Sequence, residues 1–311
     1  MHNSVLYFQK HLYKYLHKHL LHKYVRKYSS RFMFLLLTVA STNSGINALA
    51  DGSAYGESLS SRQLNFPQQN PSTNILEVSQ NDLRSAIPSE LSTILSQVDA
   101  AANSRSTSQL TLLYTGEFTN SDNLDRDKML EALTALWKRY PNLNYRTEVQ
   151  SWEYRAGGFM VETVTNISGI TEQDGTTTKF QSTLRSRQII NNLRITNQEI
   201  LAERTQITIG SNPPTVRINL PEQVRVGQQY SFDAIVQEPL GDDLILGAAL
   251  EEAVSRDRYL NPAELELNLL QSGGIFKIGR APLRPEPRWI SAVLIRGSGT
   301  TVITQRLRVI D

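Results

Sequence analysis

The sequence predicts an α+β domain followed by an all-β sandwich of immunoglobulin-like type. The first observation is the stretch Asn144–Arg204, whose four strand-like segments are separated by Gly157-Gly158, Asp174-Gly175 and Asn191-Asn192. These pairs supply the residues that tight hairpins need, so the stretch predicts a four-stranded antiparallel meander. Segments with helical periodicity precede it, and that order indicates an α+β domain. About seven short strand-like segments follow Pro213-Pro214, which is typical of a sandwich.

The first 50 residues have the three parts of a secretory signal peptide. They contain seven basic and no acidic residues, then the apolar run Phe32–Ala40, then the triplet Ala48–Ala50. This pattern predicts cleavage before Asp51 and export to the periplasm or the thylakoid lumen. The apolar run is too short for a membrane span, so we expect no transmembrane anchor after cleavage. The alternative is an uncleaved amphipathic helix on a membrane surface, because leucines recur every four residues at Leu12, Leu16 and Leu20.

Removal of this leader reverses the charge of the chain. The whole sequence has 32 basic and 30 acidic residues, and seven of the basic ones lie in the leader, so the mature chain has a net charge of −5. This charge argues against nucleic-acid binding. The chain has no cysteine, and all five histidines lie in the leader. Disulfides, thiolate and imidazole metal sites, and Ser-His-Asp or Cys-His catalysis are thereby excluded from the mature protein. We expect no cofactor and no metal.

The composition divides the chain into four parts. Residues 1–50 are the signal peptide, and the polar residues 51–85 are predicted to be a flexible linker. Residues 86–213 form the α+β domain and residues 214–311 form the sandwich. In the α+β domain we expect a helix from Ser85 to Asn103, a short element from Leu110 to Tyr114, and a helix that has Asp125 as its N-cap and ends at Pro141.

The strand-like segments of the sandwich are short and separated by turn residues. They are Thr215–Leu220, Gln229–Gln237, Leu244–Leu250, Leu265–Gln271, Gly274–Ile278, Trp289–Arg296 and Thr300–Ile310. Residues Ala248–Arg258 are alternatively interpreted as a helix, since apolar residues are loosely periodic there. The pair Asp242-Asp243 is weak evidence for a calcium site and is more typical of an exposed turn.

Part of the chain resembles a known superfamily. The segments LSQVDAAANS, LTLLYTGEFTNSDNLDRDKMLEALTALWKRYPNLNYRTEVQSWE and TLRSRQIINNLRITNQEILAERTQI are similar to nuclear transport factor 2-like proteins, and to uncharacterised exported proteins of cyanobacteria. The resemblance covers Pro88–Pro214. It implies a cone-shaped domain of helices and a curved antiparallel sheet, the fold of ketosteroid isomerases and polyketide cyclases. It implies no particular activity, because this scaffold has many functions. Such domains often form dimers.

The resemblance implies a pocket between the helices and the sheet. Its candidate lining is five aromatic residues and three charged ones: Tyr114, Phe118, Trp137, Tyr145, Trp152, Arg185, Arg187 and Glu199. The alternative is that the aromatics fill the interior and that the arginines pair with Glu148, Glu162 or Glu199 on neighbouring strands. Enolate chemistry needs a carboxylate base and a buried acid, for which Asp99, Asp122, Glu199 and Glu203 are the available carboxylates. No acid-base pair of the family can be matched, so no catalytic residue is assigned.

A second candidate site lies between two predicted strands of the sandwich. Arginines are held apart by prolines next to a tryptophan, which is typical of a contact surface for an acidic partner: Arg280, Arg284, Arg288 and Trp289. A solvated loop has the same pattern. The sequence thus favours an exported, non-enzymatic binding or assembly protein that presents its two domains to a protein partner. The alternative is a carrier of small apolar ligands, or an isomerase-like enzyme, that uses the cone cavity.

Overall fold

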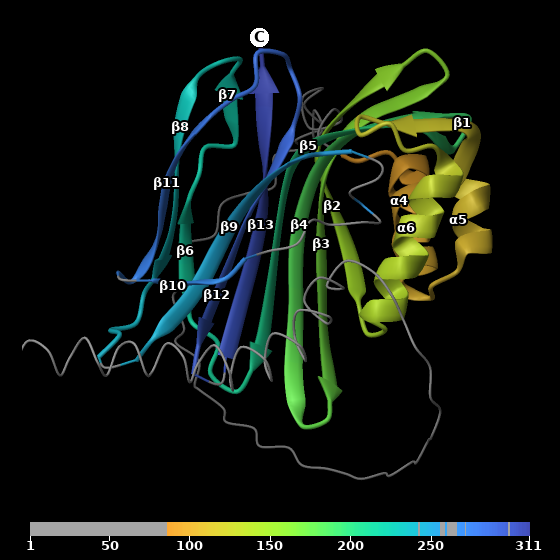
Figure 1. Cartoon of the computed structure of the whole chain (residues 1–311). Helices are drawn as coiled ribbons and strands as arrows, with labels where there is room; N and C mark the ends of the chain where they lie inside the picture. Colours follow the sequence, from red (N-terminus) through yellow and green to blue (C-terminus); the bar gives the residue numbers. More distant parts are fainter. Residues whose placement is uncertain (1–85, 242, 256–258, 260–265, 271, 298) are drawn as a thin grey trace, which may run out of the picture. The chain divides into compact units, whose positions relative to one another are not determined.

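The first and third helices of the described residues lie where caps and periodicity predict them, whereas the short element predicted for Leu110–Tyr114 is a helix that begins earlier, at Thr107, and Tyr114 begins a strand. The computed structural model describes residues 86–311 except 242, 256–258, 260–265, 271 and 298 (Figure 1). The helices are α4 (Ser89–Asn103), α5 (Thr107–Leu113) and α6 (Arg126–Arg139). Asp125 is the N-cap of α6, since its carboxylate accepts a hydrogen bond of 2.8 Å from the amide of Lys128. The signal peptide and the linker lie outside the described residues.

The predicted meander is confirmed. It consists of β2 (Asn144–Arg155), β3 (Gly158–Gln173), β4 (Thr176–Asn191) and β5 (Arg194–Gly210), each antiparallel to the next. Both residues of the β3–β4 turn have positive φ, 52° at Asp174 and 69° at Gly175. This is the mirror-image turn geometry that matches the twist of hairpin strands. A further strand, β1 (Tyr114–Asn120), pairs with β5 in parallel.

The meander does not end at β5, and the predicted fold class is therefore wrong. Strand β13 (Gly299–Ile310) pairs with β5, from Gly299 opposite Gly210 to Gln305 opposite Arg204. Beyond it the sheet continues through β12 (Arg288–Arg296), β9 (Ile245–Ala253) and β10 (Asn268–Leu270). Its order is β10-β9-β12-β13-β5-β4-β3-β2, and in the described residues it crosses the boundary predicted at 213 (Figure 1).

A smaller sheet covers one side of this continuation. It has the order β11-β8-β6, formed by β6 (Val216–Asn219), β8 (Gln229–Val236) and β11 (Gly274–Arg280). The short strand β7 (Gln223–Arg225) pairs in parallel with the end of β13. Inward residues of this sheet pack on the large sheet in one apolar core, which includes Tyr230, Phe232, Ala234, Ile290, Ala292, Leu294, Ile303 and Leu307.

The second apolar core lies between the helices and the meander. It contains residues of all three helices and of β2 to β5, among them Leu91, Leu110, Trp137, Tyr145, Val161, Ile190 and Ile195. Thus the part of the chain that the structure describes is largely antiparallel β-sheet with three helices. It is not a helix-and-sheet cone followed by an immunoglobulin-like sandwich. The physical reason is that β13 pairs with β5, so that four of the strands assigned to the sandwich extend the sheet of the meander instead.

The structure also bears on two local predictions, the alternative helix at Ala248–Arg258 and the pair Asp242-Asp243. Strand β9 runs through Ala253, so the helix considered for Ala248–Arg258 is absent as far as that residue, and residues 256–258 lie outside the described part. Asp242 is likewise outside it. The carboxylate of Asp243 accepts a hydrogen bond of 2.8 Å from Nε of Arg296, which places it in an ion pair.

Candidate functional site

Four of the five aromatic residues predicted to line a pocket belong to one apolar core, and Trp152 packs against it. The rings of Tyr114 and Phe118 meet edge to face at 4.9 Å, and both residues are buried. Nε1 of Trp137 donates a hydrogen bond of 2.9 Å to the hydroxyl of Tyr145 inside the same core. Trp152 is half-buried against this core. The side chains therefore fill the space that the ligand hypothesis requires to be open.

The three charged residues of the predicted pocket lie on the opposite face of the sheet. Arg187 alternates with the core residues of β4 and pairs with Glu162 at 2.7 Å and with Glu199 at 3.0 Å, across neighbouring strands. Arg185 on the same face pairs with Glu222 at 3.3 Å. The pairing of Arg187 is the cross-strand pairing that we gave as the alternative, whereas Arg185 pairs with a residue that the alternative did not name; both arginines are separated from the aromatics by the sheet.

The predicted lining residues take no part in either of two surface depressions formed by described residues. One, of about 330 Å³, lies between α4 and β2 and includes Asp99 and Thr147. The oxygens of Asp99 accept hydrogen bonds of 2.7 Å from the amide and the hydroxyl of Thr147. The other, of about 310 Å³, lies on the outer face of β3, β4 and β5 and includes Asn166 and Arg204. Both are open to solvent.

The residues of the predicted partner surface divide into two groups. Arg280 and Arg284 are exposed. Arg288 is half-buried, with its Nε 3.6 Å from a carboxylate oxygen of Glu251. Trp289 is buried, and its Nε1 donates a hydrogen bond of 3.0 Å to Glu203. Trp289 therefore belongs to the interior and is not available to a partner.

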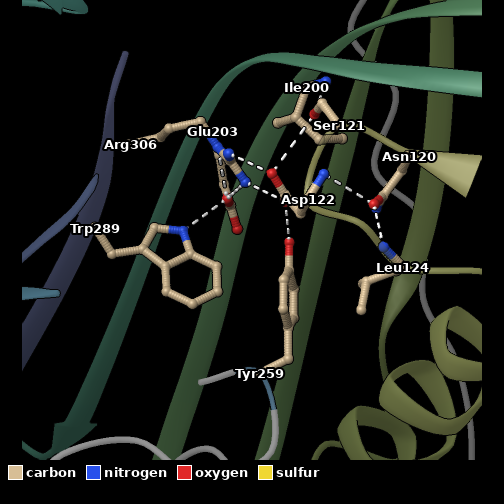
Figure 2. A network of polar contacts seen from close by, with 9 residues as sticks. All are labelled: Asn120, Ser121, Asp122, Leu124, Ile200, Glu203, Tyr259, Trp289 and Arg306. Atoms are coloured by element: carbon tan, nitrogen blue, oxygen red, sulfur yellow. Dashed lines mark hydrogen bonds and ion pairs between the residues drawn. The ribbon is translucent and has the colours of Figure 1, made fainter. Parts of the chain in front are cut away.

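Trp289 leads to a buried polar network that the sequence analysis did not assemble (Figure 2). At its centre the guanidinium of Arg306 donates two hydrogen bonds to the carboxylate of Asp122, at 2.8 and 2.7 Å. The same guanidinium lies 3.1 Å from an oxygen of Glu203. Arg306 is 2% exposed and Asp122 is 3% exposed. The hydroxyl of Tyr259 donates to the second oxygen of Asp122 at 2.5 Å.

The turn after β1 places Asp122. The side-chain oxygen of Asn120 accepts hydrogen bonds from the amides of Asp122 and Leu124, at 3.0 and 2.9 Å. Asn120 thereby fixes a turn around its own side chain, as asparagine commonly does. Ser121 ties this turn to β5, since its amide donates to Gln198 and its hydroxyl accepts from the amide of Ile200 (Figure 2).

Two members of the network, Trp289 and Arg306, lie on strands of the large sheet that come late in the sequence. Trp289 on β12 and Arg306 on β13 are direct cross-strand neighbours, so they point to the same face. The ring of Tyr259 meets that of Trp289 edge to face at 4.8 Å. The network thus connects the turn after β1 with β5, β12, β13 and the residue Tyr259.

Charge and burial in the network favour a structural role, in which the network holds the turn and the strands together, over a catalytic role. Burial by itself lowers the pKa of Arg306, but the carboxylates of Glu203 and Asp122 raise it well above its usual range. Burial raises the pKa of Tyr259, and the same two carboxylates raise it further. Arg306 therefore stays charged and Tyr259 stays protonated. Both oxygens of Asp122 are occupied by donors, so this carboxylate has no position from which to take a substrate proton.

Buried phenols make the stability depend on alkaline pH. Burial raises the pKa of Tyr145 to about 12, and it raises those of Tyr114 and Tyr259 as well. In the unfolded chain these phenols lose their protons near pH 10. Their contribution to stability is therefore complete below pH 10 and is lost as the pH rises toward the folded-state values. We expect each to lower the free energy of unfolding by about 1.4 kcal/mol per pH unit above 10.

Urea unfolding between pH 8 and pH 11 measures this dependence. The control is Tyr114→Phe, which removes one buried phenol. Its loss of stability from pH 10 to pH 11 is expected to be smaller than that of the unchanged protein. Equal curves for the two proteins would show that Tyr114 titrates alike in both states.

The described residues offer few other sites. They contain no group of three or more Asp, Glu, His or Cys residues placed to hold a metal ion. Within the same part of the chain, no helix combines the length and the apolar character needed to cross a membrane.

The comparisons with known proteins give one match, which covers residues 211–310. No curated protein matches the sequence. The resemblance of residues 88–214 to nuclear transport factor 2-like proteins stays a prediction. The fold class that it implied is wrong, as described above. Residues 211–310, which include β6 to β13 and therefore Trp289, Tyr259 and Arg306 of the network, match the family model described as Domain of unknown function (DUF8623).

Proposed function

We propose that the mature protein is an exported, non-enzymatic binding or assembly protein that presents its sheets to a protein partner. The observation that carries the proposal is where the structure places the eight residues predicted to line a pocket. The aromatic ones fill a packed core, and the charged ones form ion pairs on the other face of the sheet. Small-molecule sites are concave and combine an apolar lining with a few converging polar groups. Here the apolar and polar groups are separated by the sheet.

The polar network supports the same function. Its carboxylates, guanidinium and phenol are paired with one another, so it stabilises the scaffold instead of receiving a ligand. Several large apolar side chains are instead exposed on the strands, among them Phe276 and Ile278. Exposed apolar groups that cluster mark interaction surfaces more often than scattered ones do.

The function is tested with residues 51–311, the expected mature chain. We expect cross-linking in the exported fraction of the source cells to capture a defined protein. That protein, once purified, should bind the mature chain with a dissociation constant that is independent of the cross-linker. A panel of small apolar metabolites should leave the melting temperature unchanged, because a bound ligand raises stability with its occupancy. Turnover of a small carbonyl substrate, or stabilisation by a metabolite, would contradict the proposal.

Export is tested separately. We expect residues 1–50, fused to a reporter that is active only outside the cytoplasm, to deliver it and to be removed before Asp51. The matched control replaces the apolar run Phe32–Ala40 by alternating serine and glycine, which should keep the reporter in the cytoplasm. Equal reporter activity from the two fusions would refute the signal-peptide assignment.

A further inference from the structure

Strand β11 forms an open edge of the smaller sheet. Among the described strands β11 pairs only with β8, along all seven residues from Gly274 to Arg280. On its other side alternate amides and carbonyls have no strand partner. An edge of this kind is a template for a further strand, and proteins usually protect it with charges, prolines or bulges.

The hydrogen bonds around β11 show which residues face the open edge. The amide of Val236 donates to Gly273 at 2.8 Å, and the amide of Ala281 donates to Gln228 at 2.9 Å. Antiparallel pairs alternate between residues that bond to the partner and residues that bond away from it. The odd-numbered residues of β11 therefore bond to β8. The backbone groups of Phe276 and Ile278 point away from β8.

The same two residues expose large apolar side chains. Phe276 is 57% exposed and Ile278 is 77% exposed. Leu283, in the loop after the strand, is 88% exposed and lies close to Gly227. The lysine of the strand, Lys277, alternates to the other face, where it donates to the carbonyl of Ala249 at 3.4 Å. The open edge is thus apolar where a protected edge would be charged.

Basic residues flank this apolar edge. Arg280 continues the row of Phe276 and Ile278, and Arg217 lies on the same outer face of the sheet. Within the described residues neither of these arginines has a carboxylate at ion-pair distance. Arg284 follows in the loop, with its side chain 81% exposed and its Nε 3.5 Å from a carboxylate oxygen of Glu286. Asp233 is the carboxylate that β8 places on this face, and it is bonded to Asn219.

We propose that β11 is the docking site of an extended segment of the protein partner, which adds to the smaller sheet as a fourth strand. This inference rests on the proposed function and names the partner chemistry. The segment has apolar residues at alternate positions, which pack on Phe276 and Ile278. It has carboxylates at the end that lies beside Arg280 and Arg284. Main-chain hydrogen bonds supply affinity in this mode of recognition, and the side chains supply specificity. A second copy of β11 fits less well, because it brings the same arginines.

The probe is a labelled nine-residue peptide, in which two glutamates at each end enclose five residues of alternating valine and threonine. We expect it to bind residues 51–311 in fluorescence anisotropy. A peptide with lysines in place of the glutamates should bind at least tenfold more weakly. A peptide with alternate amides N-methylated should not bind, because it cannot form the ladder of backbone hydrogen bonds.

Variants of the protein locate the site. Ile278→Pro removes an amide that faces the open edge, and Ile278→Ser removes only the apolar contact. We expect the first to abolish binding of the glutamate peptide, and the second to weaken it severalfold. Arg284→Glu should weaken it while the melting temperature is unchanged. The matched control is Ile170→Ser on β3, where the isoleucine is 57% exposed, and binding should be unaltered.

Equal binding of the lysine peptide and the glutamate peptide would overturn this inference, and so would equal binding of the glutamate peptide by the Ile278→Ser protein and the unchanged one. A dimer of the mature chain that Ile278→Pro dissociates would also overturn it, because the occupant would then be a second copy. If the captured partner binds the Ile278→Ser protein unchanged, β11 is refuted while the proposed function stands. If no partner exists and a metabolite is turned over, the proposed function itself fails.

Discussion

Replacement of Arg306 by methionine is expected to lower the free energy of unfolding by about 3 to 5 kcal/mol. The guanidinium holds the carboxylate of Asp122 through two hydrogen bonds and lies 3.1 Å from Glu203. The side chain of Asp122 has no exposed surface. Without Arg306 this charge remains in the interior with only the hydroxyl of Tyr259 as a side-chain donor within 3.0 Å. Breaking a buried pair by the loss of one partner is costly for this reason.

Urea unfolding of three variants separates this effect from a general loss of packing. The double variant with Arg306→Met and Asp122→Asn should recover part of the lost stability, since Asp122→Asn removes the carboxylate charge that Arg306→Met leaves buried without its partner. The control is Arg185→Met, which breaks the exposed pair with Glu222 and should cost about 0 to 1 kcal/mol. Similar losses for Arg306→Met and Arg185→Met would show that the network contributes no more than a surface pair.

Replacement of Trp137 by alanine is expected to cost about 3 to 5 kcal/mol as well. The indole is buried in the core between α6 and the meander, and its Nε1 donates to Tyr145 at 2.9 Å. Its removal therefore takes apolar surface out of the core and leaves a cavity that the surrounding helices and strands fill only partly. The midpoint of urea unfolding measures the loss.

Two matched variants divide this cost. Tyr145→Phe keeps the packing but leaves the N–H of Trp137 without its acceptor, which should cost about 1 to 3 kcal/mol. Trp152→Ala removes an indole that is only half-buried and should cost less than Trp137→Ala. An unchanged melting temperature for Trp137→Ala would mean that α6 presents another face to the core.

Local elements were predictable because their signals are local. Asp125 marks the start of α6 because its side chain caps an amide three residues later. The pair Asp174-Gly175 marks a hairpin because both residues adopt positive φ there. The pairing of strands, in contrast, depends on residues that are distant in the sequence. The alternation along β5 is satisfied equally by an open edge and by a neighbour, so the sequence pattern did not show that β13 pairs with it.

The network was missed for a related reason. Asp122 and Glu203 were among the carboxylates considered for catalysis, and Trp289 was assigned to a partner surface. Their common partner, Arg306, lies far away in the sequence, within the otherwise strand-like segment that became β13. An arginine in a strand is usually solvated, and only the pairing of β13 with β12 and β5 makes Arg306 the centre of the cluster.

The pairing of β5 with β13 has a consequence for how the protein is made. When the meander leaves the ribosome, β1 can pair with β5 at Ile195–Gln198, but Arg204–Gly210 have a strand on one side only until the chain has been synthesised as far as β13. The largest sheet therefore closes by contacts between distant parts of the chain, a topology associated with slow folding. During that interval the edge of β5 is open to other chains. Late closure of this sheet therefore leaves a strand edge exposed during synthesis, where it can pair with another chain before β13 covers it.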